Sequence, residues 1–422
     1  MGRRWSAACV ALEVTQRCNL DCSLCYLSEN SEAVQDLPLA EVLRRAEQIH
    51  RYYGPGTDVQ ITGGDPTLRN REELISIVRK VSDLGMRPTL MTNGRRATRD
   101  LLAALADAGL VDVAFHVDTT QQIKGYADER ALNVLRQKYI DAAAGLPISI
   151  MFNTTVHAGN LSELPMLADF FLQNADHIRT ASFQLQADTG RGVLGKRDAL
   201  VTPDSVMQGI QAGADIAINF NSVQVGHPQC SRYGMCHRVN GKTFDLFDDA
   251  DAIGRFQVAT AGIEFNRQSP IKVIRGLAAW LLAHPGDILF SARWAYRKLR
   301  QIGLDFIKAK GRMHTLSFVV HNFMDACQLQ PERIDACVFK TMTRDGPISM
   351  CMHNAKRDEF IGQRVVVSTD EGVKVWYPFK GKYYPADGMP AVEPEPEPPK
   401  LTLKQARGRL RDRLLAERFH GI

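Results

Sequence analysis

A regular alternation of short apolar runs and amphipathic stretches, from residue 8 to about residue 190, most constrains how this chain can fold. The apolar runs have the length and the β-branched residues of strands, and the stretches between them have helical spacing. We expect six strands within residues 9–15, 57–67, 87–94, 111–119, 147–156 and 177–186. Alternation of this kind predicts an α/β fold built on a parallel sheet with crossover helices.

Distinctive residues follow four of these strands. Three cysteines follow the first strand, and Gly63-Gly64-Asp65-Pro66 follows the second. The third strand ends in Thr92-Asn93-Gly94 and the fourth in His116-Val117-Asp118. Because the carboxyl ends of parallel strands meet at one edge, where such folds carry their chemistry, we expect these residues to form one site.

The cysteines after the first strand are Cys18, Cys22 and Cys25, in a C-x3-C-x2-C array. A structural zinc site needs four ligands, and no fourth cysteine or histidine lies close by in the sequence. Three thiolates also suit an iron–sulfur cluster in which one iron is left open for another ligand. The spacing alone leaves zinc and a cluster as alternatives.

The Gly63–Pro66 segment, taken alone, could be an ordinary tight turn. Together with the cysteine array it resembles the radical S-adenosylmethionine (SAM) superfamily, in which the three cysteines bind a 4Fe-4S cluster. The resemblance covers roughly residues 8–190 and implies a partial (β/α)6 barrel of the TIM type. It also implies that SAM chelates the open iron and that its amino group binds at the glycine loop, where Asp65 replaces the usual Glu. The reduced cluster would cleave SAM to methionine and a 5′-deoxyadenosyl radical.

Four further residues at strand ends are candidate contacts for SAM or substrate: Thr92, Asn93, His116 and Asp118. Each could equally cap a loop, and His116 could be a core histidine because Phe115 and Val117 flank it.

A second set of cysteines lies far downstream, at Cys230, Cys236, Cys327, Cys337 and Cys351. Dispersed cysteines are often buried and inert. These, however, lie in loop-like segments, and Cys337 and Cys351 flank a predicted hairpin at Asp345-Gly346. A metal site is therefore the alternative to an inert role.

The downstream segments resemble the archaeal pterin-methylating and tetraether lipid synthase group of the superfamily. The similar segments are His227-Pro228-Gln229-Cys230, Phe323-Met324-Asp325-Ala326, Cys337 and Cys351-Met352-His353-Asn354. The resemblance implies an auxiliary 4Fe-4S cluster at Cys230, Cys236, Cys337 and Cys351, with Cys327 as a spare ligand. Members of that group have more cysteines upstream, whereas here only Cys9 precedes the array, so we expect two clusters and a structural role for Cys9.

Composition predicts four parts of the chain: the barrel at 8–195, an auxiliary-cluster and helical cap region at 196–385, a Pro/Glu linker at 386–400 and a basic amphipathic helix at 401–422. Within the second part, residues 250–313 look mainly helical. Aromatic and basic residues are interspersed there: Trp280, Trp294, Tyr296, Arg275, Arg293, Arg297, Lys298 and Arg300. They indicate either a cap over the barrel mouth or an interfacial surface that admits a lipid chain.

The formal charge of +5 is mild for 422 residues, and no dense basic run indicates nucleic acid. The N-terminal segment has no long apolar run before Glu13, so we expect no signal peptide. His284, Pro285 and Asp287 interrupt the most apolar later stretch, so a membrane span is not expected. Nine cysteines without an export signal favour metal binding over disulfides. We expect a cytoplasmic protein, peripheral at the membrane if its substrate is a lipid.

The leading hypothesis is a radical SAM enzyme that abstracts hydrogen from an unactivated C–H bond, for C–C bond formation or alkylation. A lipid or other apolar substrate is favoured over a pterin-like molecule and over a peptide, and a flavodoxin- or ferredoxin-type protein would be the reductant. The alternative class is a non-catalytic iron–sulfur protein for electron transfer or sensing, which would not need the glycine loop.

Overall fold

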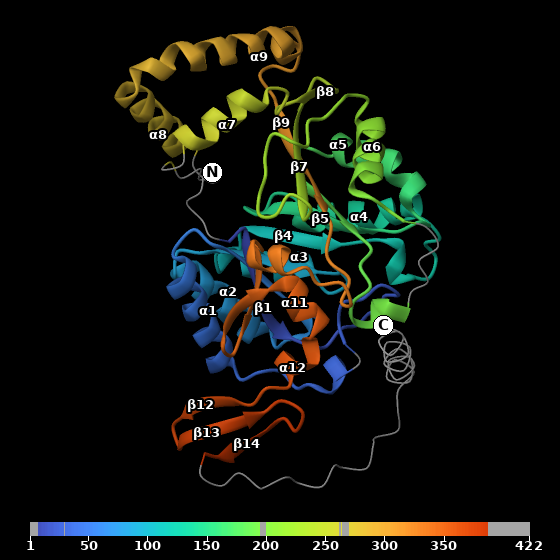
Figure 1. Ribbon diagram of the computed structural model, residues 1–422, viewed down its shortest axis with the longest axis vertical. Coiled ribbons are helices and arrows are strands. Elements are labelled where there is room, and N and C mark those ends of the chain that lie inside the picture. Colours follow the sequence, from blue (N-terminus) through green and yellow to red (C-terminus); the bar gives the residue numbers. More distant parts are fainter. Residues whose placement is uncertain (1–6, 29, 195–199, 261–262, 264–269, 387–422) are drawn as a thin grey trace.

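The computed structural model describes residues 7–28, 30–194, 200–260, 263 and 270–386 (Figure 1). The linker predicted at 386–400 lies outside these residues except for its first position, and the helix predicted at 401–422 lies wholly outside them.

One large sheet organises the described part of the chain, in the order β11-β10-β1-β2-β3-β4-β5-β6-β9-β7-β8. Its strands are β1 (Cys9–Thr15), β2 (Asp58–Gly63), β3 (Arg87–Thr92), β4 (Asp112–His116), β5 (Ser149–Val156), β6 (Ile178–Leu185), β7 (Ser231–Val239), β8 (Lys242–Asp245), β9 (His314–His321), β10 (Phe339–Thr343) and β11 (Gly346–Ser349). Strands β1 to β6 pair in parallel in chain order, as predicted. The predicted α/β partial barrel is therefore confirmed.

Helices connect the parallel strands and cover the outer face of the sheet: α1 (Leu39–Tyr53), α2 (Arg71–Asp83), α3 (Arg99–Asp107), α4 (Glu129–Ala143), α5 (Leu164–Gln173) and α6 (Pro203–Ala214). Helix α2 shows why these segments are helical. The Asn70 side chain caps its first turn, and Leu74, Ile77, Val78 and Val81 are buried at the 3- and 4-residue spacing of one helix face.

Two late strands extend the barrel beyond the predicted boundary near residue 195. Strand β9 pairs in parallel with β6, and β10 pairs in parallel with β1. The hairpin predicted at Asp345-Gly346 is confirmed, because β10 and β11 pair antiparallel with Thr343 opposite Gly346. The large sheet therefore contains strands from both sides of the predicted domain boundary near residue 195.

Three helices form an arm at one end of the molecule: α7 (Ala250–Ala259), α8 (Pro270–Ala283) and α9 (Ile288–Lys308) (Figure 1). The arm leads into the amino end of β9, so it lies toward the amino ends of the parallel strands. At the opposite end of Figure 1 lies a small sheet of β12 (Val365–Thr369), β13 (Gly372–Tyr377) and β14 (Lys382–Pro385). Short helices α10 (Pro331–Asp335), α11 (Met350–Ala355) and α12 (Arg357–Ile361) complete the C-terminal region.

Among the described residues, no single helix has the length and apolar composition to cross a membrane. The segments Ile271–Ala283 and Pro285–Lys308 reach that composition only when taken together, and a bend of 107° separates them.

Candidate cofactor and substrate site

A cavity of about 1820 Å³ runs along the inner face of the parallel sheet. Every second residue of strands β1 to β6 lines it, which is the period of one strand face: Cys9, Ala11, Glu13, Asp58, Gln60, Thr62, Arg87, Thr89, Met91, Asp112, Ala114, His116, Met151, Asn153, Thr155, Thr180, Ser182 and Gln184. Many of these side chains are small or polar, whereas a closed barrel fills this position with bulky apolar residues. The barrel interior is therefore open space.

The two ends of the cavity differ in chemistry. At the carboxyl ends of the strands, Cys18, Cys22 and Cys25 line it. Toward the amino ends, helices of the arm line it with apolar side chains: Phe256, Leu277, Trp280, Leu281, Phe290 and Trp294. Strands of five to eight residues separate the two ends, roughly 20 Å at the usual rise per residue. The volume exceeds the roughly 300–1,000 Å³ of a site for one small ligand.

The cysteine loop follows β1 and is held from outside itself. The Ser23 N–H donates to the Thr120 carbonyl oxygen (2.9 Å), and the Gly192 N–H donates to the Cys25 carbonyl oxygen (3.0 Å). The Arg191 guanidinium donates to Cys25 Sγ at 3.3 Å. Burial raises the pKa of Cys22, and the nearby Cys25 adds to this shift. The sequence analysis identified the cysteines of this loop but none of the residues that hold it in place.

Gly63 and Gly64 have to be glycines because their backbone contacts the chain that leads into the cysteine loop. A Cβ on Gly63 would lie 1.9 Å from the Thr15 carbonyl oxygen, and one on Gly64 would lie 2.0 Å from the Arg17 carbonyl oxygen. Gly63 also has φ of +129°, a conformation that side chains disfavour. The motif therefore packs backbone against backbone directly before Cys18.

The side chains of Asp65 and Pro66, predicted to contact the cofactor, do not line the cavity. Asp65 is fully buried, and its carboxylate accepts hydrogen bonds from Thr92 Oγ1 (2.9 Å), from the Asn93 N–H (2.9 Å) and from Thr67. These donors occupy the carboxylate, and contact of the Gly63–Pro66 segment with a cofactor stays a prediction. Asp65 instead ties the end of β2 to the end of β3.

Thr92 and Asn93 do line the cavity, as predicted. Asn93 Nδ2 donates to Asn19 Oδ1 at 2.6 Å and lies 3.9 Å from Cys18 Sγ, so this residue joins β3 to the cysteine loop. Their contact with a cofactor stays a prediction.

His116 and Asp118 form a pair of which only the histidine faces the cavity. His116 Nε2 lies 2.7 Å from Asp118 Oδ2, and the carboxylate also accepts the Thr155 N–H (2.7 Å). Burial favours neutral His116, but the Asp118 carboxylate more than offsets this and raises the pKa of His116 above its usual value. Asp118 is fully buried, so its side chain positions His116, and its contact with a ligand stays a prediction.

Three buried polar atoms of the cavity lining have no hydrogen-bond partner within the described part of the chain. They are Asn153 Nδ2, Gln121 Oε1 and Thr189 Oγ1, all buried and all on cavity-lining residues. Buried polar groups are normally paired, so these atoms fit a polar ligand between the cysteine loop and the strand ends. The sequence analysis missed them. Asn153 could have been found, because it lies near the end of the fifth predicted strand, as His116 does in the fourth.

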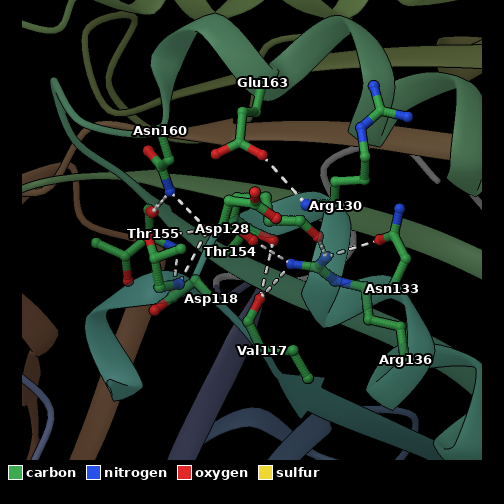
Figure 2. A network of polar contacts seen from close by, with 12 residues as sticks. Val117, Asp118, Asp128, Arg130, Asn133, Arg136, Thr154, Thr155, Asn160 and Glu163 are labelled. Carbon is green, nitrogen blue, oxygen red and sulfur yellow. Dashed lines mark hydrogen bonds and ion pairs between the residues drawn. The ribbon is translucent and has the colours of Figure 1, made fainter. Parts of the chain in front are cut away.

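A buried network of polar contacts holds the segment that carries Val117 and Asp118 (Figure 2). Arg136 on α4 donates to the Val117 carbonyl oxygen (2.8 Å) and to the carboxylate of Glu129. Glu129 in turn accepts the Thr119 N–H (2.9 Å) and Asn160 Nδ2 (2.8 Å). Arg136 and Glu129 are both fully buried. The network fixes the segment that ends in Thr120, where the cysteine loop is attached.

A second buried pair joins the C-terminal region to the cysteine strand. Arg357 on α12 donates to Glu13 on β1 and to Gln16 Oε1 (3.0 Å), and its guanidinium lies 4.9 Å from the centre of the Tyr26 ring. Tyr26 Oη donates to the Gly63 carbonyl oxygen. Burial opposes ionisation of Glu13, but Arg357 and its other partners lower the pKa of this carboxyl to about 2.

Three of the four predicted auxiliary ligands, Cys230, Cys337 and Cys351, line one small pocket of about 20 Å³. Arg333 Nε donates to Cys230 Sγ at 3.3 Å, and the Cys337 thiol donates to the Phe339 carbonyl oxygen at 3.0 Å. In the described residues, no three His, Cys, Asp or Glu side chains are arranged as a site for a metal ion. An auxiliary cluster therefore stays a proposal.

Cys236, the fourth predicted auxiliary ligand, lies elsewhere. It is on β7 opposite Leu316, fully buried in the main hydrophobic core. Five residues, all in the strand, lie between it and Cys230, which places the two roughly 20 Å apart. It cannot share a cluster with Cys230, so that prediction is wrong. The spare candidate Cys327 is exposed and lines neither cavity.

The aromatic and basic residues of the arm divide between its two sides. Trp280 and Trp294 line the cavity, whereas Tyr296 is 68% exposed. Lys298 is buried and donates to Asp248 Oδ1 (2.7 Å), and Arg297 donates to Asp249 Oδ2 (2.7 Å). The arm covers the amino-end side of the barrel, opposite the cysteine loop.

Comparison with known proteins gives a family for the first part of the chain. Residues 12–157 match the sequence profile of the Radical SAM superfamily. The chain is 29% identical over 187 residues to a 7,8-dihydro-6-hydroxymethylpterin dimethyltransferase of Methanocaldococcus jannaschii, covering 43% of this chain and 36% of that one. It is 30% identical over 165 residues to a PqqA peptide cyclase of Methylobacterium nodulans, covering 37% and 41%.

Among solved structures, Streptococcus suis SuiB bound to precursor peptide SuiA has a TM-score of 0.38 and 17% identity, over 46% of this chain and 42% of that chain. That likeness is too low to support an inference. The chain spans less than half the length of the curated relatives named above. The matched segment contains the three cysteines of the array, the glycine loop and the ends of strands β1 to β5. Residues 12–157 therefore carry a Radical SAM domain, which is consistent with the expected superfamily.

Proposed function

We propose that this chain is a radical SAM enzyme that acts on a long apolar substrate, most simply a lipid, inside the barrel. Cys18, Cys22 and Cys25 would hold a 4Fe-4S cluster, and SAM would bind between the open iron, the Gly63–Gly64 backbone and the unpaired polar atoms near Asn153. When reduced by a flavodoxin- or ferredoxin-type protein, the cluster supplies the electron that cleaves SAM to methionine and the radical that abstracts hydrogen from the substrate.

The observation that carries this proposal is the continuity of the cavity. One space of about 1820 Å³ reaches from the three thiols to the apolar side chains of α8 and α9. A polar cofactor would fill the carboxyl end, where His116, Gln121 and Asn153 lie. The remaining length is open, and the arm end is apolar, which suits a hydrocarbon chain.

The chain's own residues would position both molecules. The His116 side chain is one-third exposed, to the cavity, and its raised pKa extends the protonated form to higher pH than usual. It would donate to an anionic or carbonyl oxygen of the cofactor or the substrate. Trp280 and Trp294 would exclude water from the arm end.

Anaerobic reconstitution with iron and sulfide, followed by dithionite and SAM, tests the proposal. We expect 5′-deoxyadenosine by chromatography, and we expect Cys22→Ala to abolish it. Cys327→Ala is the matched control, because this exposed cysteine lines neither cavity. A protein with an intact cluster that makes no 5′-deoxyadenosine would be an electron carrier or a sensor, and the proposal would fail.

An auxiliary cluster at Cys230, Cys337 and Cys351 is the second part of the proposal. Their shared pocket supports it, and so does Arg333, which offers a donor to a cysteine sulfur as Arg191 does at the first array. Cys337→Ala should keep SAM cleavage but lose substrate turnover. Iron analysis of the reconstituted protein should give about eight iron atoms per chain, and about four would refute the auxiliary cluster.

A pterin-like substrate is the second candidate, favoured by the similarity to a pterin dimethyltransferase over 187 residues. The polar carboxyl end of the cavity could hold such a ring. Adding each compound to the SAM-cleavage assay distinguishes the two substrates. If a pterin is the substrate, it should lower the share of SAM that is cleaved without substrate turnover, and a long-chain lipid should not. A peptide substrate, suggested by the similarity to a peptide cyclase, would be distinguished in the same assay.

A further inference from the structure

We propose that the outer faces of α8 and α9 dock on an anionic lipid bilayer. The choice of a bilayer rests on the proposed function, because an apolar substrate of that kind is stored in a membrane. The docking surface itself is argued from the exposed side chains, the charge and the shape of the arm.

The outward face of α9 repeats apolar and basic residues at 3- and 4-residue spacing: Leu289, Arg293, Tyr296, Arg300, Leu304 and Ile307. Leu304 is 77% exposed and Ile307 is 73% exposed. The buried residues of this helix, Lys298, Ile302 and Asp305, lie on the opposite side. An ordinary surface helix does the reverse, burying its apolar stripe and exposing its polar one.

Helix α8 repeats the same arrangement with Ile271, Arg275, Ala278 and Leu282 on its exposed side. Ile271 is 64% exposed and Leu282 is 81% exposed. The other side carries Leu277, Trp280 and Leu281, which line the cavity. The arm is therefore one helix thick between its outer face and the interior of the barrel.

Charge selects an anionic partner. Residues 270–313 contain nine Lys or Arg and two Asp, a formal charge of +7 that exceeds the +5 of the whole chain. Both acidic residues are engaged within the protein, Asp287 by Arg255 and Asp305 by Asn240 and Lys242. Exposed apolar residues among basic ones are typical of helices that lie in a membrane interface.

The bend between the two helices indicates which membrane geometry applies. Ile271–Ala283 and Pro285–Lys308 meet at 107°, so the pair presents a broad, bent surface and no straight span. A bilayer against this surface would lie next to the apolar end of the cavity, because α8 and α9 line that end with their inner sides. A lipid chain would then enter from the amino ends of the strands and extend toward the cysteine loop.

Vesicle flotation of the full chain, reconstituted anaerobically, tests the docking surface. The probes are vesicles of phosphatidylcholine alone and of phosphatidylcholine with phosphatidylglycerol in equal parts. We expect binding to the anionic vesicles that weakens with salt. Arg293→Gln with Arg300→Gln should weaken it roughly 30-fold, at about 1 kcal/mol for each basic residue at such a surface. Leu304→Gln with Ile307→Gln should weaken binding to both vesicle types.

Two control variants remove equal features elsewhere. Arg51→Gln with Arg79→Gln removes two exposed charges from α1 and α2, and Val366→Gln with Val373→Gln removes two exposed apolar residues from the small sheet. Both should bind like the wild type. Binding that all four double variants weaken equally would overturn the proposal, as would no flotation with either vesicle. A dimer, measured by light scattering, that the arm variants dissociate would also overturn it, because a second copy would then cover the face.

The formation of 5′-deoxyadenosine separates the two proposals. If the chain cleaves SAM but does not float with vesicles, only the docking surface fails. If it floats but makes no 5′-deoxyadenosine, only the proposed enzyme function fails.

Discussion

Replacing Arg136 by Met tests the network that supports the site. In the wild type its guanidinium donates to the carbonyl oxygens of Val117 (2.8 Å) and Glu129 (2.9 Å), and to the Glu129 carboxylate. Met keeps much of the volume and removes every donor. The Glu129 carboxylate would then remain fully buried with no cation beside it.

The size of the effect follows from this burial. Removing one partner of a buried ion pair costs about 3–5 kcal/mol, because the remaining charge cannot be solvated. Glu129→Gln keeps the Oε1 acceptor for the Thr119 N–H and Asn160, but places an amide N–H₂ against Arg136. In the double variant there is neither an unpaired buried carboxylate nor an amide N–H₂ that faces a guanidinium. We therefore expect its cost to be smaller than the sum of the single costs by about 2 kcal/mol.

Urea unfolding of the four proteins gives these free energies, and hydrogen–deuterium exchange gives the local effect. Arg136→Met should speed exchange in the peptides that contain Ser23 and Thr119, because the segment that holds the cysteine loop is loosened. Strictly additive costs, or unchanged exchange in both peptides, would refute the reasoning. Arg99→Met is the control, because Arg99 is exposed and donates only to the end of α4.

Three further predictions concern the site. Gly64→Ala places a Cβ 2.0 Å from the Arg17 carbonyl oxygen and should reduce iron retention and the melting temperature. Gly254→Ala is the control and should keep both, because open space surrounds that position. Equal iron content in the two variants would contradict this prediction. The stability that wild type gains over His116→Gln should be full below pH 6.5 and be lost as pH rises through the raised pKa of His116, measured as urea midpoints at pH 6 and pH 9. At the acid end, the Asp118 contribution is lost only as pH falls through its lowered pKa, and a difference between the proteins that grows toward pH 9 would show that the sign is wrong. Arg191→Gln removes a cation 3.3 Å from Cys25 Sγ and should lower the cluster's reduction potential by roughly 60 mV in an EPR-monitored titration, while an unchanged potential would assign Arg191 a purely structural role.

The sequence predicted the parallel strands because each is an apolar run close to its neighbour in the chain. It also predicted that the cysteines, Thr92 and His116 meet, since they lie at the carboxyl ends of parallel strands in one sheet. It could not pair β9 with β6 or β10 with β1, because periodicity identifies a strand but not a partner more than a hundred residues away.

Side-chain direction limited the prediction of the site. Asp65 and Asp118 follow strands as expected, yet their carboxylates turn to backbone N–H groups within the protein. Cys236 looked like a partner of Cys230 because the intervening residues resemble a loop, but they form β7 and move the two thiols apart. The outward apolar face of α9 follows the same helical spacing as a buried one, so only packing distinguishes the two.

The pairing of β10 with β1 also sets an order of events during synthesis. Strand β1 can pair with β2 once residue 63 has been made, but its other neighbour ends at residue 343, about 280 residues later. At roughly 5–20 residues per second, the edge of the cysteine strand stays unpaired for about 15–60 s on the ribosome. Over the same interval Glu13 lacks Arg357. An unpaired strand edge can pair with another chain, so a chaperone that covers the edge of β1 until β10 arrives would protect the cysteine strand from aggregation.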